Sequence, residues 1–374
     1  LGAGAGSFTI DRKNFDLDLA LGGGSQRLRL NIGLPPDRTL RLDLALADAD
    51  LTQLLKLADI GSLTLSQARG TGRILVRSPA DDYADAEGEA TLTALRLVLE
   101  GEVWESRDPL ELAWRGRTVM VRRARFRSAD REVEIHGRLE DGGQTDLQVS
   151  GQLPFAALSS RLPHMKPTGG MVTADIRVRG SLSTPEYEGI LQLAGGSLTL
   201  PGIPVPLQNV RGTTELQAGR ALIRELRGEI AGGSLQGTGE ASWRANDWGF
   251  QFVFQEDNGR AEQLLAGVYT DKSGVTGSLS LGGTLSGRGR GEEDFFSNLK
   301  GDLKLAMRDG RMGRQALATR ILSLINIGQL FDTGGLEIAS QGLPYHRLTA
   351  DVIIEQGAAR TENLLFESRA FNMS

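Results

Sequence analysis

Hydrophobic and polar residues alternate along most of this chain. In the clearest stretch, Leu40, Leu42, Leu44 and Leu46 are separated by Arg41, Asp43 and Ala45. Because the side chains of a β-strand point to opposite faces in turn, this period of two predicts antiparallel strands with one apolar and one wet face. The period recurs at Leu28–Ile32, Val133–Ile135, Val172–Val178, Phe250–Phe254, Leu279–Leu281, Leu303–Met307 and Leu348–Ile354. We therefore predict an all-β fold with few helices.

Short clusters of turn-forming residues separate the alternating segments. Ala218-Gly219, Asp309-Gly310 and Gln356-Gly357 are examples, and each predicts a tight turn between two strands. Helical patterns are rare and short, at 50–59, 154–162 and 260–267. A longer one covers 314–331, where an apolar stripe follows the spacing of a helix. Its members are Leu317, Ile321, Leu324 and Ile325.

The three short helical patterns are evenly spaced. Leu54 and Leu158 lie 104 positions apart, and Leu158 and Leu264 lie 106 apart, while flanking segments match at similar offsets. A length of 374 residues also exceeds what one hydrophobic core usually serves. We therefore expect about three and a half copies of a repeat of roughly 104 residues. The copies are a partial repeat over 1–49, the first repeat over 50–153, the second repeat over 154–259, and the third repeat over 260–374, which contains the inserted helix.

A chain of strands with few helices must cover its apolar faces in some other way. Two sheets can pack as a sandwich, or one long sheet can curl so that its apolar face lines a trough. Glycines such as Gly151, Gly237 and Gly239 stand where the alternation expects inward apolar residues, which favours the curled sheet. We predict a long curled antiparallel sheet that forms a hydrophobic groove. Its expected lining is Leu28, Leu30, Ile32, Leu42, Leu44, Leu46, Val133, Ile135, Ile176, Val178, Leu191, Leu193, Phe250, Phe252, Phe254, Leu279, Leu281, Leu303, Leu305, Val352 and Ile354.

Composition narrows the choice of function. The chain has 49 glycines and 5% aromatic residues, a balance typical of a turn-rich β-protein whose interior is aliphatic. A formal net charge of −5 argues against a dedicated nucleic-acid-binding protein. Since there is no cysteine, disulfides, thiolate metal sites and cysteine nucleophiles are excluded.

The ends of the sequence suggest a piece of a longer protein. No apolar run approaches the roughly 18 to 20 residues that span a bilayer, and no signal peptide is visible. The first residue is Leu1, and the last residues, Asn372, Met373 and Ser374, follow an alternating segment. We expect that a membrane anchor or an export signal precedes Leu1 in the full protein.

Several segments resemble the AsmA/TamB superfamily of bacterial envelope proteins. The resemblance rests on a short helix (PFAALSSRL), a strand that ends in Val178-Arg179-Gly180, and the strings STPEYEG and GGSLQGTG. The segment 301–371 of the third repeat, in which an apolar helix separates two groups of strands, is similar to the AsmA-like C-terminal region. The resemblance covers most of 50–374 and implies a β-groove in the periplasm of a Gram-negative bacterium. It also implies anchoring in the inner membrane by an N-terminal helix, and transport of phospholipid along the groove.

Candidate chemistry is sparse. None of His136, His164 and His346 lies within metal-ligand spacing of another, and the acidic run from Asp81 to Glu89 lacks the spacing of a calcium loop. The pairs Asp16/Asp18 and Asp48/Asp50 each share one strand face, as carboxylates do on a wet surface. Arg123, Arg125 and Arg127 also share a face, either as a solvated strand or at a groove rim that meets phosphate headgroups. We predict no catalytic residue, no metal and no cofactor.

These observations favour a lipid conduit that is not an enzyme. Its expected partners are phospholipid acyl chains, with membrane proteins or membrane surfaces of the inner and outer membranes at the ends, and no nucleic acid. Two alternatives stay open: a scaffold that pairs its strand edges with outer-membrane proteins during their assembly, and a structural β-repeat spacer. The helix over 314–331 either caps the sheet, gates the groove or contacts a membrane.

Overall fold

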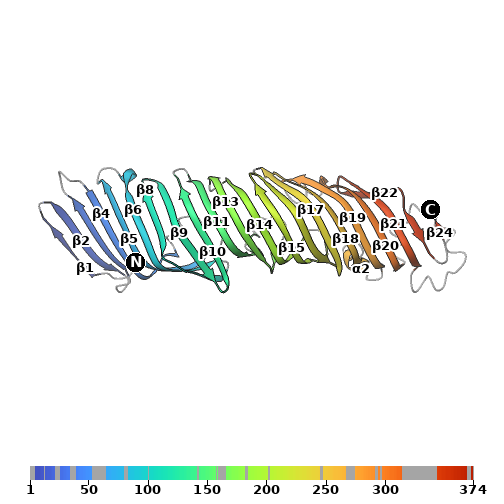
Figure 1. Cartoon of the computed structure of the whole chain (residues 1–374), viewed down its shortest axis with the longest axis horizontal. Helices are drawn as coiled ribbons and strands as arrows, with labels where there is room; N and C mark the ends of the chain where they lie inside the picture. The colour runs from blue at the N-terminus through green and yellow to red at the C-terminus, as the bar shows by residue number, and fades with distance from the viewer. Residues whose placement is uncertain are drawn as a thin grey trace. The chain divides into compact units, whose positions relative to one another are not determined.

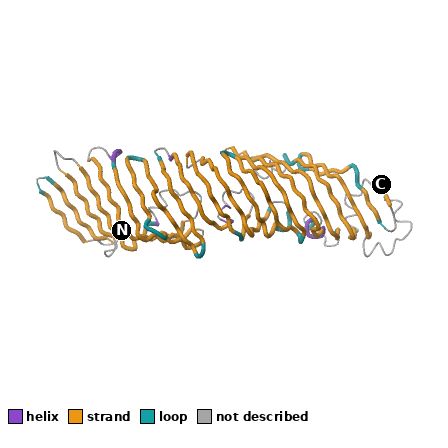
Figure 2. The backbone as a smooth tube through the Cα atoms, in the orientation of Figure 1, coloured by secondary structure: helices purple, strands orange, loops and turns teal. Residues whose placement is uncertain are grey.

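The computed structural model describes residues 5–11, 13–21, 26–33, 39–52, 65–79, 83–99, 101–140, 143–156, 158, 166–181, 184–200, 203–244, 247–266, 274–290, 294, 297–313, 343–368 and 372–373. Strands occupy nearly all of them (Figure 2). These strands belong to one antiparallel sheet, which confirms the predicted fold class and excludes the two-sheet sandwich for this part of the chain. The sheet is compatible with a curled groove.

The chain divides into two compact units. Unit 1 comprises Leu1–Leu153 and Thr173–Ile190, and unit 2 comprises Pro154–Val172 and Leu191–Ser374. Both β13 (Met171–Ser181) and β14 (Thr184–Thr199) contribute residues to the two units. The boundary at 153/154 coincides with a predicted repeat boundary, while the number of repeats stays a prediction.

Unit 1 is a meander in which strands that follow one another in sequence are paired (Figure 1). Two short strands, β7 and β8, occupy the same position in the sheet, because each pairs with β6 on one side and with β9 on the other. Pro109 separates β7 from β8 in the sequence. The elements of unit 1 are β1 (Ala5–Ile10), β2 (Asn14–Leu21), β3 (Gln26–Gly33), β4 (Thr39–Asp50), β5 (Leu65–Pro79), a short 3₁₀ helix (Tyr83–Asp85), β6 (Glu87–Leu99), β7 (Glu102–Ser106), β8 (Leu110–Arg115), β9 (Thr118–Ser128), β10 (Arg131–Leu139) and β11 (Gln144–Pro154).

Unit 2 is also a meander, in which each strand from β15 to β21 pairs with the next one in sequence. Both β22 and β23 then pair with β21. The elements are β12 (Lys166–Thr168), β15 (Leu207–Gln217), β16 (Arg220–Ile230), β17 (Gly233–Arg244), β18 (Asp247–Arg260), α2 (Ala261–Leu264), β19 (Val275–Gly289), β20 (Lys300–Met312), β21 (Leu343–Glu355), β22 (Ala358–Thr361), β23 (Leu365–Glu367) and β24 (Asn372–Met373).

The predicted helices are shorter than expected or lie outside the described residues. Asp50, Pro154 and Arg260, which open the three short helical patterns, each end a strand. Of the third pattern only the single turn α2 is helical. Most of 50–59 and of 154–162 is outside the described residues, and so is all of 314–331 with Leu317, Ile321, Leu324 and Ile325.

β-Bulges interrupt the strand pairing in both units. In β4 the register shifts between Leu46 and Ala49, and Asp48 takes a φ of 49°. Since a bulge bends its strand and increases the local twist, these positions curve the sheet. Asp309, with the same φ of 49°, lies inside β20, so the turn predicted at Asp309-Gly310 is wrong. Aspartate and asparagine tolerate this left-handed conformation in turns and bulges alike, which is why the dipeptide misled the prediction.

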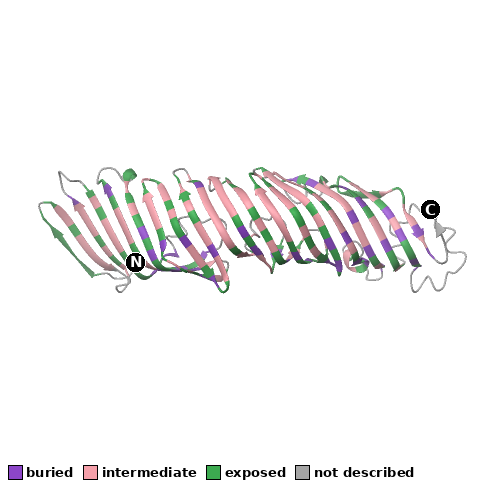
Figure 3. Ribbon diagram, viewed as in Figure 1, coloured by how far each residue is buried: buried purple, intermediate pink, exposed green. Residues whose placement is uncertain are grey.

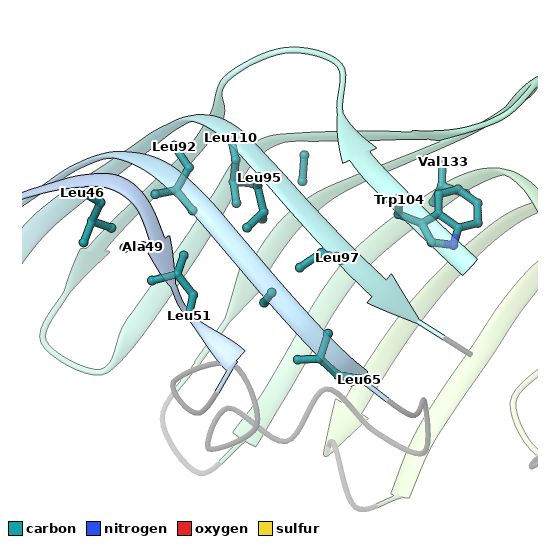
Figure 4. Close-up of a cluster of buried hydrophobic side chains, with 12 residues drawn as sticks. Leu46, Ala49, Leu51, Leu65, Leu92, Leu95, Leu97, Trp104, Leu110 and Val133 are labelled. Carbon is teal, nitrogen blue, oxygen red and sulfur yellow. The ribbon is translucent and has the colours of Figure 1, made fainter. Parts of the chain in front are cut away.

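Buried and exposed residues alternate along single strands, as the sequence pattern predicts (Figure 3). In unit 1 most of the buried apolar side chains form one cluster, to which β4, β5, β6, β7, β8, β9 and β10 contribute (Figure 4). Unit 2 contains two clusters, one around Leu207, Val210, Ile230 and Leu235 and one around Leu279, Met307, Leu343 and Tyr345. Thus each unit has apolar cores of its own on one side of the strands.

Candidate functional site: the apolar face of the sheet

In unit 1, apolar side chains line up across neighbouring strands. Leu30 pairs with Leu17 on one side and with Leu42 on the other, so these residues share a face. Directly opposite side chains in an antiparallel pair lie about 4.5–5.5 Å apart at Cβ, close enough for continuous apolar contact. The adjoining row crosses seven strands and consists of Leu19, Leu28, Leu44, Ile74, Ala90, Leu112 and Val121.

Much of this face is only half-buried. Leu28, Leu30, Leu42 and Leu44 are all intermediate in exposure, whereas Leu46, nearer the bulge of β4, is buried. In β1, which the described residues pair with β2 alone, Phe8 and Ile10 lie on this face and are 68% and 64% exposed. An aliphatic surface that spans many strands and is not fully covered is typical of a binding surface for an apolar ligand or partner.

The opposite face carries a ladder of ion pairs. Arg27 donates to both carboxylate oxygens of Asp18, at 2.9 and 2.7 Å. Arg73 makes the same two-bond contact with Asp43, at 2.7 and 2.6 Å. The hydrogen bond from Arg73 holds the pKa of Asp43 below its ordinary value. These charged side chains are stable only in contact with water, so this face of the sheet is solvated and the apolar residues lie on the other face.

Unit 2 replaces part of the aliphatic lining with aromatic rings. Phe250, Phe252 and Phe254 follow one another on the same face of β18, and their partners on β17 include Gly239 and Gly237. The ring of Phe252 lies over both glycines: a Cβ at Gly239 would stand 2.5 Å from its Cδ2, and one at Gly237 would stand 2.7 Å from its Cζ. Phe252 and Phe254 stack with their ring centroids 6.1 Å apart, so aromatic rings occupy the space above the two glycines.

All predicted lining residues are buried or intermediate in exposure. Hydrogen bonds support this placement for β13. Gln148 donates to Asp175 and Arg177 donates to Asp146, so Ile176, which lies between Asp175 and Arg177, is on the opposite, apolar face. Val133 pairs with Phe126, and Leu303 pairs with Val352, as members of one face should. The structure therefore brings these residues onto apolar faces within their units, and their contact with lipid stays a prediction.

The polar candidates fit ordinary surface roles. His136 and His346 are exposed, and His164 lies outside the described residues. Asp48 is paired with Arg69 at 2.6 Å, and Arg125 is paired with Asp108 at 2.5 Å. Within the described part of the chain, no group of histidines and carboxylates is placed to hold a metal ion.

One residue of this face was missed by the sequence analysis. Glu256 continues the alternation of Phe250, Phe252 and Phe254 and is only 3% exposed. It lies opposite Leu235 on β17 and Leu281 on β19, so its carboxyl group faces the apolar side. Extending the alternation by one more step places it there, but glutamate side chains are mostly exposed to water in folded proteins.

The carboxyl group of Glu256 is unusual in its chemistry. Both of its oxygens are buried, and neither has a hydrogen bond of acceptable geometry. Burial raises the pKa of Glu256 to about 7; the nearby backbone amides of Gly259 and Leu281 offset part of this effect, and Asp257 adds to it. A carboxyl group in such a place is half-protonated near neutral pH.

Comparisons of the chain with protein-family models, with curated proteins and with solved structures give no match. Among the described residues, no helix is long and apolar enough to cross a bilayer. The functional argument therefore depends on the two faces of the sheet.

Proposed function

We propose that this chain is a lipid conduit of the bacterial envelope, which carries phospholipid acyl chains along the apolar face of its sheet between the inner and outer membranes. The observation that supports the proposal is the half-buried aliphatic row from Leu19 to Val121, which crosses seven strands without a charged residue. The resemblance to AsmA/TamB proteins, in the segments from the short helices to GGSLQGTG, points in the same direction.

The physical chemistry of such a surface suits sliding transport. Each methylene group that an acyl chain buries contributes about 0.8 kcal/mol, and this energy is non-directional. A chain can therefore move along leucine and isoleucine side chains while the number of its contacts changes little. Phosphate headgroups would stay in water, and the function needs no catalytic group, metal or cofactor. Membrane proteins or membrane surfaces at the ends would deliver and receive the lipid.

Lipid bound to the purified protein would test the proposal. The chain is expressed in a Gram-negative host with an export signal, purified in a mild detergent and extracted, and the extract is analysed by mass spectrometry. We expect phospholipid in at least equimolar amount, well above the amount from an exported control protein purified in parallel. A protein that is folded by circular dichroism, free of lipid and unable to take up fluorescent phospholipid from vesicles would contradict the proposal.

A second candidate function is a scaffold for the assembly of outer-membrane proteins, and the strand β1 favours it. The described residues pair β1 with β2 alone, and its sequence Ala5–Ile10 carries no charge and no proline. An edge without such protecting residues is suited to the addition of a further strand. A photo-crosslinker at Ser7 would then capture a β-barrel protein in cells, whereas a lipid conduit would give no such product from this edge.

A further inference from the structure

Glu256 lies where the two hydrophobic clusters of unit 2 approach each other. Leu235 and Phe254, its neighbours on one side, belong to the first cluster, and Leu281 is packed against the second. Leu264 of α2 packs against both clusters. A Cβ added at Gly259 would contact the Oε1 atom of Glu256 and would stand 3.1 Å from Cδ1 of Leu264. The carboxyl group and the leucine methyl group thus border the same glycine.

This carboxyl group must either keep its proton or reach water. The backbone amides of Gly259 and Leu281 offset only part of the cost of burying a charge at Glu256, so burial still disfavours the carboxylate form. The surrounding strands offer no counter-charge, because Gly233–Gly239 on β17 and Val275–Gly287 on β19 contain no titratable side chain. Among the described residues, the charged groups nearby are Asp257 and Arg260 on β18 and Glu262 on α2. Asp257 raises the pKa of Glu256, and Arg260 and Glu262 are exposed.

Of the elements that border this site, α2 is the one most easily displaced. On the β17 side the pairing is continuous, from Ser234 with Asp257 to Gln236 with Gln255. On the β19 side the register shifts between Glu256 and Gly259, where Asn258 takes a φ of 63°. α2 directly follows this bulge, has a single turn and has no side-chain hydrogen bond at its N-terminus. A short, uncapped helix opens at a lower free energy than a strand in the middle of a sheet.

We propose that Glu256 and α2 form a proton-controlled latch: while the carboxyl group is protonated, α2 stays packed over it through Leu264, and loss of the proton releases α2 so that water reaches the carboxylate. When α2 opens, one helical turn loses its apolar contacts and the charged carboxylate of Glu256 becomes hydrated. The latch changes the apolar face locally, between Leu235 and Leu281, and does not depend on which ligand this face binds.

The direction of the pH effect follows from linkage. An opened, solvated Glu256 has a pKa near its ordinary value of 4.5, while the covered group has a pKa of about 7. Opening therefore releases a proton between these two pH values. The equilibrium constant for opening should rise by about tenfold per pH unit from roughly pH 5 to 6.5, and should level off above roughly pH 7, where both states are ionised.

Hydrogen exchange of the full-length chain between pH 5 and pH 8, corrected for the intrinsic effect of pH on exchange, measures this constant in 261–266. We expect the rise and the plateau in the wild-type protein, and no rise in Glu256→Gln, which keeps the shape of the protonated side chain. Glu262→Gln, which removes an exposed charge from α2, should behave as the wild type does. A wild-type protein without the rise, or a Glu256→Gln protein with it, would overturn the latch.

A second variant keeps the test decisive if Glu256→Gln does not fold. Leu264→Ala retains the carboxyl group and removes its cover, so exchange in 261–266 should be faster at every pH and its dependence on pH should be smaller. Protection in β5 and β6 of unit 1 should stay the same and reports that the chain is folded. If Leu264→Ala leaves the exchange of α2 unchanged, Leu264 does not cover Glu256, and the proposal fails.

Discussion

Phe252 on β18 is the cross-strand partner of Gly239 on β17, and its ring occupies the space that a side chain at Gly239 would need. Glycine is therefore required here by the neighbouring ring. The pairing explains how a strand with three phenylalanines fits into a sheet whose other inward residues are mainly aliphatic: large rings on one strand are matched by missing side chains on the next.

Replacement of this glycine should be costly. In Gly239→Val the new side chain displaces the ring of Phe252 and approaches the carbonyl oxygen of Gln251, so we expect a loss of about 1–3 kcal/mol in the free energy of unfolding. Thr238→Val, one position away on the exposed face, is the matched control and should change it by less than about 0.5 kcal/mol. Chemical denaturation measures both, and equal losses in the two variants would contradict this account.

A pair of glycine-to-alanine substitutions separates backbone strain from steric exclusion. Gly101 and Gly151 both have a positive φ, of 80° and 137°. A Cβ at Gly101 meets nothing within 4 Å, whereas one at Gly151 would collide with the carbonyl oxygen of Glu132. Gly101→Ala should cost about 1 kcal/mol of unfolding free energy, from conformation alone. Gly151→Ala should cost roughly 2 kcal/mol more, and similar values for the two variants would show that the strand pair can relax.

The stability of the protein should depend on the protonation of Glu256. The pKa of Glu256 is about 7 in the folded protein, whereas the ordinary value, which applies to the unfolded chain, is 4.5. The folded state therefore binds this proton more tightly than the unfolded state does. This contribution to stability is fully present below about pH 4.5 and is lost as the pH rises through about 7. Relative to Glu256→Gln, the wild-type protein should lose up to roughly 3 kcal/mol between pH 4.5 and pH 8. Denaturation curves at the two pH values measure the difference, and parallel behaviour of the two proteins would refute it.

A charge on the apolar face should reduce lipid binding if the proposed function is correct. Leu44 pairs with Leu28 and Ile74 on the apolar face, while Ala45 next to it is exposed on the opposite face. Leu44→Asp is expected to lower the amount of co-purified phospholipid at least tenfold, because a carboxylate in contact with acyl chains is strongly disfavoured. Ala45→Asp should bind as much lipid as the wild type. A reduction of the same size in both variants would point to a general loss of folding.

The sequence by itself determined the strands and their two faces. A period of two in hydrophobicity is typical of a strand, so the pattern alone places segments such as Leu40–Leu46 and Phe250–Phe254 in strands and identifies their inward residues. The wet face followed for the same reason, since Arg41 and Asp43 alternate with leucines. The predicted turn at Asp309-Gly310 failed because a bulge within a strand and a turn between strands use the same residues and the same backbone conformation.

Only the tertiary structure decided the pairing between strands, and with it the environment of particular residues. That Phe252 covers Gly239, that Gly151 faces the carbonyl oxygen of Glu132, and that Glu256 lies between Leu235 and Leu281 are consequences of register, which links positions far apart in sequence. Local pattern carries no information on which strand is opposite, because a hydrophobic partner on any strand satisfies the alternation equally well. The burial of Glu256 beside the helical turn α2 therefore depends on how the strands are joined into a sheet.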